Sequence, residues 1–190
     1  MSIVGFVILG LLAVVVVYFI IIYNGLVAVK HSVAKAWANI DVLLKQRHDE
    51  LPKLVETCKQ YMKFEQETLE KVMQARSRVA DARAAHDVPA LGTAEGALRV
   101  GLGNLFAVAE AYPELKTNET FQHLQTRISG LENAIADRRE FYNDSVNVNN
   151  VRIEEFPDVI VARMFAFKAY PLLEFDKAET EDVDLKKEFA

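Results

Sequence analysis

The sequence has little of the chemistry on which most functional sites depend. A single cysteine, Cys58, among 190 residues excludes an intramolecular disulfide, and four scattered histidines supply no ligand cluster for structural zinc. Acidic residues outnumber basic ones by 27 to 22, for a formal net charge of -5. This balance argues against a nucleic-acid partner held by bulk positive charge. A disulfide-stapled secreted fold and a zinc module are excluded.

The first 29 residues contain no Asp, Glu, Lys, Arg or His, and residues 3–23 are almost wholly Val, Ile, Leu and Phe. Roughly 20 such residues in a helix, at about 1.5 Å each, cover the ~30 Å hydrocarbon core of a bilayer. A cleaved signal peptide is the alternative, but it has a basic start, a shorter apolar run and a small-residue exit. We therefore expect residues 1–25 to form a transmembrane anchor.

Charge beside the anchor predicts its orientation. The nearest cations, Lys30 and Lys35, both follow the apolar stretch. The positive-inside rule favours a cytoplasmic C-terminal domain over the opposite orientation.

After the anchor, apolar residues recur every three to four positions, which predicts amphipathic helices. The first helix continues from the anchor, a second begins at Asp49–Pro52, His86–Pro89 interrupts the chain, and Pro113 separates a third helix from a fourth. Short links predict antiparallel neighbours. The expected fold is all-α: an N-terminal transmembrane helix followed, over residues 26–150, by an up-down antiparallel four-helix bundle with coiled-coil-like packing. By this division the second and fourth helices exceed the others by roughly 15 Å, so either the bundle leans along the bilayer surface or the long helices overhang and present faces to other copies.

Several short motifs occur in one characteristic order. They are Tyr23-Asn24-x-Leu26-Val27, Ala36-Trp37-x-x-Ile40-Asp41-Val42-x-Leu44-Lys45-x-Arg47, Leu51-Pro52-x-Leu54-Val55, Tyr61 with Glu65, Tyr112-Pro113-x-Leu115-Lys116, and Glu132-Asn133-x-Ile135 with Arg139, Tyr142 and Asn143. Together they resemble the LemA family of bacterial membrane proteins, from about Ile3 to Phe175. The sequence departs from the family pattern at Phe64, where a histidine is expected.

The resemblance implies a single span in the cytoplasmic (inner) membrane, a long antiparallel helical bundle and no established catalytic activity. The motif aromatics that we expect to pack between helices are Trp37, Tyr61, Tyr112 and Tyr142.

Charged residues occupy positions where the helical stripes predict apolar ones. These residues are Arg47, Glu65, Arg76 and Arg138. Unpaired and buried, each would cost several kcal/mol, so each either extends to the rim of the bundle or has a close partner. Counting residues from the turns places Arg76 level with Glu132, which predicts an ion pair that fixes the register of the bundle.

The segment 151–175 is unusually rich in aromatic residues, among them Phe156, Phe165, Phe167 and Phe175. We expect a short helix over Asp158–Ala169. It either folds back and caps the bundle, or its rings dock on a neighbouring subunit. The acidic residues 176–190 are expected to form a solvated, partly mobile end.

A search for catalytic patterns finds none. The chain has no Glu-x-x-His of a di-iron bundle, and Gly101-Leu102-Gly103 lacks the third glycine of a dinucleotide loop. Cys58 lies on an apolar stripe without a histidine beside it. We therefore expect no enzyme activity, no cofactor and no metal.

Two functional hypotheses remain. One is a membrane-anchored structural protein that self-associates and organises or remodels the bilayer. The other is a membrane-tethered adaptor that binds and positions a protease, transporter or signalling protein. The expected partners are further copies of the chain, the lipid bilayer or another membrane protein.

Overall fold

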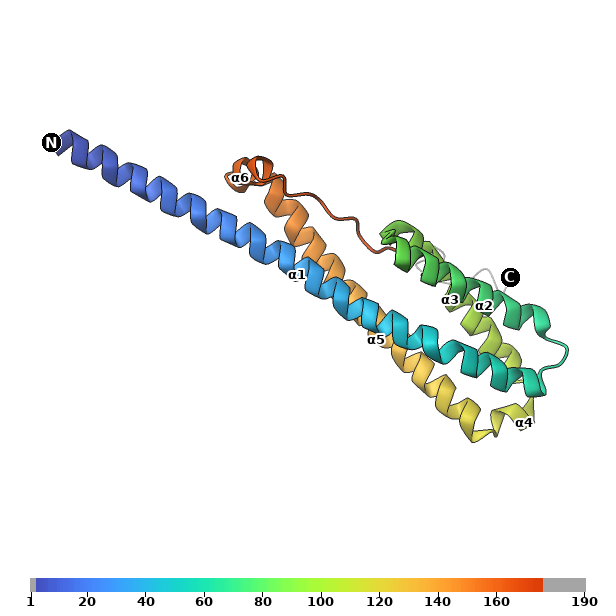
Figure 1. Cartoon of the computed structure of the whole chain (residues 1–190). Helices are drawn as coiled ribbons and strands as arrows, with labels where there is room; N and C mark the ends of the chain where they lie inside the picture. Colours follow the sequence, from blue (N-terminus) through green and yellow to red (C-terminus); the bar gives the residue numbers. More distant parts are fainter. Residues whose placement is uncertain (1–2, 176–190) are drawn as a thin grey trace, which may run out of the picture. The chain divides into compact units, whose positions relative to one another are not determined.

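The computed structural model describes residues 3–175 and contains six helices and no strand within that range (Figure 1). The helices are α1 (Ile3–Tyr61), α2 (Gln66–Ala85), α3 (Val88–Ala109), α4 (Pro113–Lys116), α5 (Glu119–Glu154) and α6 (Asp158–Met164). The all-α fold class is confirmed. The acidic end expected at 176–190 lies outside the described residues.

The chain divides into two compact units, and α1 and α5 each contribute to both. One, called here the anchor unit, comprises Met1–Ala38 and Glu140–Pro171. The other, called the bundle unit, comprises Asn39–Arg139 and the chain from Leu172 onward.

Within the bundle unit, four helical segments from α1, α2, α3 and α5 enclose a core of aliphatic side chains. Side-chain pairs between helices are Asp41–Arg83 and His48–Arg76 for α1 with α2, and Glu50–Arg127 for α1 with α5. Tyr61 of α1 also bonds to Asn118, the residue just before α5. Residue numbers rise along α1 while they fall along the partner, so both partners run antiparallel to α1. The turn between α2 and α3 lies at His86 and Asp87, inside the predicted interruption, and the Asp87 side chain accepts a bond of 3.0 Å from the Ala90 N–H as an N-cap.

The predicted helix start at Asp49–Pro52 is wrong, because α1 continues without a break to Tyr61 with Pro52 in its interior. The buried face of α1 explains this continuity. Leu44, Arg47, Leu51 and Leu54 are all buried and follow one another at steps of three or four residues. A break at Pro52 would interrupt this face, so the chain turns instead at residues 62–65.

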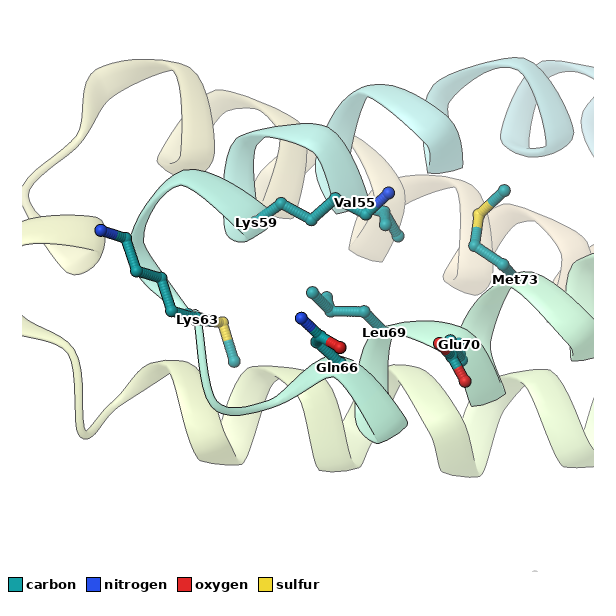
Figure 2. Close-up of a pocket in the computed structure, with 8 residues that line it drawn as sticks. Val55, Lys59, Lys63, Gln66, Leu69, Glu70 and Met73 are labelled. Carbon is teal, nitrogen blue, oxygen red and sulfur yellow. The ribbon is translucent and has the colours of Figure 1, made fainter.

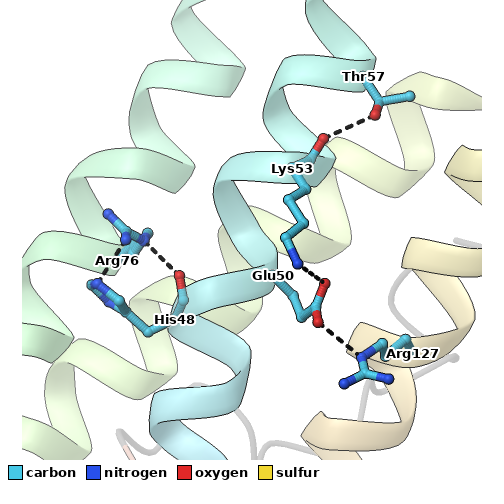
Figure 3. Close-up of polar contacts among 6 residues, drawn as sticks. All are labelled: His48, Glu50, Lys53, Thr57, Arg76 and Arg127. Atoms are coloured by element: carbon cyan, nitrogen blue, oxygen red, sulfur yellow. Dashed lines mark hydrogen bonds and ion pairs between the residues drawn. The ribbon is translucent and has the colours of Figure 1, made fainter.

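A proline inside a helix removes the N–H that would bond to the carbonyl four residues earlier. For Pro52 that carbonyl belongs to His48, and the Nε–H of Arg76 on α2 donates to it at 2.9 Å. The Nη2 of Arg76 also lies 2.6 Å from Nε2 of the His48 ring, as Figure 3 shows. Burial, and then the charge of Arg76, lower the pKa of His48, which favours a neutral ring that accepts the Arg76 proton. Arg76 therefore supplies the hydrogen bond that Pro52 cannot make.

Because α1 continues to Tyr61, the long and short helices differ from those predicted. α1 and α5 have 59 and 36 residues, whereas α2 and α3 have 20 and 22. The prediction that the second helix is longer than the third is therefore wrong, whereas the fourth, α5, is long as expected.

The coupling between Pro52 and Arg76 can be measured with a double-mutant cycle. Arg76→Met should cost about 1–3 kcal/mol, because the His48 carbonyl loses its donor. In a Pro52→Ala background the same change should cost at least about 1 kcal/mol less, since an alanine in place of the proline restores an N–H to that carbonyl. Urea unfolding of the four variants in detergent, followed by circular dichroism, gives both costs. Equal costs in the two backgrounds would show that Arg76 acts independently of Pro52.

Candidate functional sites

A charged cluster lies in the centre of the bundle unit. Arg47 of α1 is 1% exposed and Glu95 of α3 is 3% exposed. Arg47 donates through Nη2 to Glu95 and through Nη1 to Glu132 of α5. Its Nε has no hydrogen-bond partner within the described part of the chain. One cation thus ties three helices together.

The cluster holds two carboxylates for one guanidinium, which gives it a formal charge of -1. Burial, assisted by the nearby Glu132, raises the pKa of Glu95 despite the opposing effect of Arg47. For Arg47, burial acts to lower the pKa, but the two carboxylates outweigh it and raise the pKa. Arg47 and Glu95 are almost fully buried, whereas Glu132 is 19% exposed, so the cluster joins the three helices from the inside of the bundle toward its surface.

The predicted Arg76–Glu132 pair is wrong, because Glu132 bonds to Arg47 while Arg76 bonds to His48. The counting error follows from the misplaced start of the second helix. Glu95 was missed altogether, although the sequence carries a signal for it. It lies four residues after Leu91 and three before Leu98, on the buried stripe of α3.

The remaining predicted polar positions lie nearer the surface. Glu65 is half-buried and accepts a bond of 3.4 Å from the Tyr112 hydroxyl. The Tyr61 hydroxyl accepts a bond of 3.1 Å from the Asn118 side-chain amide. Arg138, expected on the buried stripe, is exposed.

The aromatic segment 151–175 is called the tail here. Its last residue, Phe175, packs in the bundle unit against Arg139. The guanidinium carbon of Arg139 lies 3.9 Å from the centre of the Phe175 ring. Just before it, the backbone of Glu174 crosses α3 so closely that a Cβ on Gly92 would lie 1.9 Å from the Glu174 carbonyl oxygen. The end of the tail therefore requires glycine at position 92.

A groove of about 690 Å³ opens in the bundle unit beside the turn between α1 and α2 (Figure 2). Lys59, Lys63, Gln66 and Glu70 contribute its polar lining, and Leu69 is among the apolar side chains. The lining contains no Cys, His, Ser or Thr, so its titratable side chains are Lys59, Lys63 and Glu70.

On the opposite face of α1 from Arg76, Glu50 joins α1 to α5 at the surface of the bundle. Figure 3 shows its carboxylate between Lys53 on the same helix, at 3.3 Å, and Arg127 of α5, at 3.0 Å. The Thr57 hydroxyl donates to the Lys53 carbonyl at 2.9 Å. These exposed contacts each contribute little stability.

In the anchor unit, two asparagines of α5 hold the extended tail by its backbone. The Asn149 side-chain amide donates to the Lys168 carbonyl at 3.0 Å. Asn150 donates to the Tyr170 carbonyl at 2.9 Å and accepts from the Tyr170 N–H at 3.0 Å. In the sequence these asparagines lie where the apolar pattern of the fourth helix ends, and nothing there indicates this role. In the structure they bind the backbone of the tail and hold it alongside α5.

Tyr142 also binds the tail, because its hydroxyl donates to the Pro171 carbonyl at 3.1 Å. Its ring packs against Trp37 of α1 with the ring centres 5.6 Å apart. Two of the motif aromatics therefore lie together, where they join α1, α5 and the tail.

The tail aromatics Phe165 and Phe167 pack on α1 of the same chain. Phe165 lies 4.7 Å from Tyr23 and 6.1 Å from Phe19, measured between ring centres, and Phe167 lies 6.2 Å from Tyr23. Beneath them Ile22 and Leu26 of α1 form a buried cluster with Val161 and Ala162 of α6. These two rings pack within their own chain, but on α1 in the anchor unit rather than as the expected cap on the bundle. Phe156 is 77% exposed.

The helix expected over Asp158–Ala169 is shorter than predicted and ends at Met164. Ala166 adopts a left-handed conformation with φ of 54°, and the Phe167 N–H closes the end by donating to the Ala162 carbonyl at 2.9 Å. At the other end of α6, Arg152 of α5 donates to Asp158 at 2.8 Å. This ion pair fixes the start of α6 against the last turn of α5.

Residues 3–21 of α1 are almost entirely exposed and apolar. Within residues 3–175, α1 is the one helix long and apolar enough to cross a membrane. The same range contains no group of three or more His, Cys, Asp or Glu placed to hold a metal ion.

Comparison with known proteins supports the resemblance seen in the motifs. A family profile described as the LemA family matches residues 36–186. Protein LemA from Metamycoplasma hominis is 26% identical over 182 residues, which cover 94% of this chain and 82% of that protein.

The chain is also similar to two Magnetosome proteins. MamQ 2 from Paramagnetospirillum magneticum is 37% identical over 79 residues, or 42% of this chain and 29% of that protein. MamQ from Magnetospirillum gryphiswaldense is 35% identical over the same length. The chain thus spans less than a third of the MamQ proteins that it matches. Together with the exposed apolar stretch of α1, these matches indicate a membrane-associated protein.

The buried cluster predicts that replacing Arg47 costs much more stability than replacing Arg138. Arg47→Met leaves two carboxylates without their cation and should destabilise the bundle by about 3–5 kcal/mol. Arg138→Met, the same change at an exposed position, should stay within about 0.5 kcal/mol of the natural chain. Adding Glu95→Gln to Arg47→Met should recover part of the loss by removing one buried charge. Chemical unfolding of the three variants tests this, and an Arg47→Met protein as stable as Arg138→Met would contradict the role given to the cluster.

Proposed function

The chain belongs to the LemA family, and we propose that it is a non-enzymatic, membrane-anchored structural protein whose copies self-associate and organise or remodel the bilayer. The observation that carries the proposal is α1 itself. A single unbroken helix contains both the exposed apolar stretch and the face that builds the bundle core. The apolar stretch and the bundle face therefore belong to one helix, with no loop between them.

An exposed apolar stripe on α5 supports self-association. Phe141, Val148 and Val151 of the anchor unit are 46%, 54% and 62% exposed. Their spacings of seven and three residues place them on one face of the helix. Water disfavours such a face, and a second copy of the chain that offers the same stripe would cover it in a two-fold contact.

The polar groups of the bundle support a role without catalysis. Arg47 and Glu95 are almost fully buried, and the lining of the groove beside the α1–α2 turn has no Cys, His, Ser or Thr. Burial raises the pKa of the Cys58 thiol to about 12, so this sulfur stays protonated and unreactive.

The second candidate function is an adaptor that positions another membrane protein. The observation in its favour is the tail, whose Phe165 and Phe167 pack on their own chain rather than reaching toward a neighbouring copy. A folded tail and an open groove are features that a single copy would present to a different partner. The number of subunits separates the two candidates.

Light scattering in mild detergent should find more than one copy of the full-length chain per particle. Phe141→Ser with Val148→Ser should reduce that number while leaving the melting temperature nearly unchanged, because both side chains are exposed. The matched control is Val42→Ser with Val100→Ser, which removes two equally exposed valines from the bundle unit. A monomeric natural chain in several detergents would refute self-association and leave the adaptor.

We also propose that the bundle faces the cytoplasm, since Lys30 and Lys35 follow the apolar stretch. A reporter enzyme that works only outside the cytoplasm, fused after Ala190, should give little activity. The matching fusion to a reporter that works only in the cytoplasm should be active. The reverse pattern would overturn this orientation.

A further inference from the structure

The tail of the anchor unit packs at the end of the apolar stretch of α1. Val161 and Ala162 of α6 share a buried cluster with Ile22 and Leu26, and Phe165 contacts Phe19. The exposed apolar run begins at Ile3, and about 20 residues of helix cross the hydrocarbon core. Phe19 to Leu26 therefore lie at the boundary between hydrocarbon and headgroups, and α6 lies at the same depth. This step rests on the membrane anchoring in the proposed function.

The outward side chains of this segment are apolar. Ile160, Met164 and Phe165 are 53%, 64% and 48% exposed, and Phe156 just before α6 is more exposed still. Ile160 and Met164 are four residues apart and share one face of α6. A face of this kind is unfavourable in water but is suited to the acyl chains beneath the headgroups.

Next to this apolar face, a cleft of about 610 Å³ is lined by two lysines, Lys30 of α1 and Lys168 of the tail. His31, Tyr23 and Tyr170 also contribute to its lining. The lining includes no Asp or Glu, and neither lysine forms an ion pair within residues 3–175. The cleft is therefore positive and open to an anion.

The direction in which the Lys30 side chain extends brings its ammonium group toward the bilayer. Lys30 lies seven residues beyond Tyr23, or about 10 Å along the helix axis. Helical side chains tilt toward the helix N-terminus, which for α1 is the membrane side. A lysine also extends its amine toward the interface while its methylenes lie along apolar surface. The ammonium group can thus reach the level of the headgroup phosphates.

We propose that this cleft binds one anionic phospholipid of the adjoining leaflet. The phosphate lies between Lys30 and Lys168 with His31 beside it, and an acyl chain lies along Phe165 and the exposed face of α6. Tyr23 contributes an aromatic ring at the interface, where such rings are favoured. A lipid with a net negative headgroup is preferred because the cleft offers two ammonium groups and no carboxylate.

The test uses the full-length protein in nanodiscs of equimolar phosphatidylcholine and phosphatidylglycerol, with native mass spectrometry of the lipids that stay bound. The natural chain should retain phosphatidylglycerol in preference to phosphatidylcholine. Lys30→Gln with Lys168→Gln should reduce this preference about tenfold. The matched control, Lys35→Gln with Lys45→Gln, changes the net charge equally at two exposed lysines outside the cleft and should keep the preference. Equal loss in both double variants, or no preference in the natural chain, would overturn the site.

A second measurement separates failure of this site from failure of the anchoring on which it rests. Single cysteines replace Val14, Met164 or Val100, carry a fluorophore, and are exposed to lipids with a nitroxide on the acyl chain. Buried Cys58 does not compete for the label. Quenching at positions 14 and 164 but not at 100 is the expected pattern. Quenching at 14 alone would refute the position of α6 and keep the anchor, whereas no quenching at 14 would refute the anchor itself.

Discussion

The hydrogen bonding of one helix backbone constrains everything else in this protein. α1 contributes the exposed apolar stretch, one wall of the anchor unit and one quarter of the bundle, so it must continue through Pro52 without unwinding. A proline in that position leaves the His48 carbonyl without its usual donor, and α2 supplies one through Arg76. The defect in α1 is thereby converted into a specific contact between two helices, and it sets where α2 must lie.

Buried polar groups fix the remaining register. An apolar stripe packs almost as well after a shift of one turn, but the hydrogen bonds of Arg47 to Glu95 and Glu132 are lost in any other alignment. The asparagines at positions 149 and 150 have the same effect on the tail, because each bonds to a particular carbonyl of the extended segment. Specific alignment of long helices is a property that a self-associating scaffold requires.

The position of α6 links the fold to the bilayer. Because the buried cluster of Ile22, Leu26, Val161 and Ala162 joins α6 to the apolar stretch, the short helix cannot remain in water if that stretch is in a membrane. The exposed rings and aliphatic side chains of the tail then have a physical explanation that packing within one chain does not give.

Elements that depend on local periodicity could be predicted from the sequence. The apolar run of residues 3–23, the stripes of the four bundle helices and the turn at His86 follow from patterns within a few turns of chain, so the all-α class and the anchor helix were available without a structure. The position of Glu95 between Leu91 and Leu98 also places it on the buried face of its helix, so its burial could have been predicted from the spacing. By contrast, the residues around Pro52 are compatible both with a helix start and with the interior of a helix. The helix continues because Arg76, 28 residues from His48, donates to the carbonyl that Pro52 leaves without its usual donor. The tail was equally undetermined: its rings predicted a contact surface, but whether they pack on α1 depends on Asn149 and Asn150, whose partners lie about 20 residues away and are backbone carbonyls that carry no sequence signal.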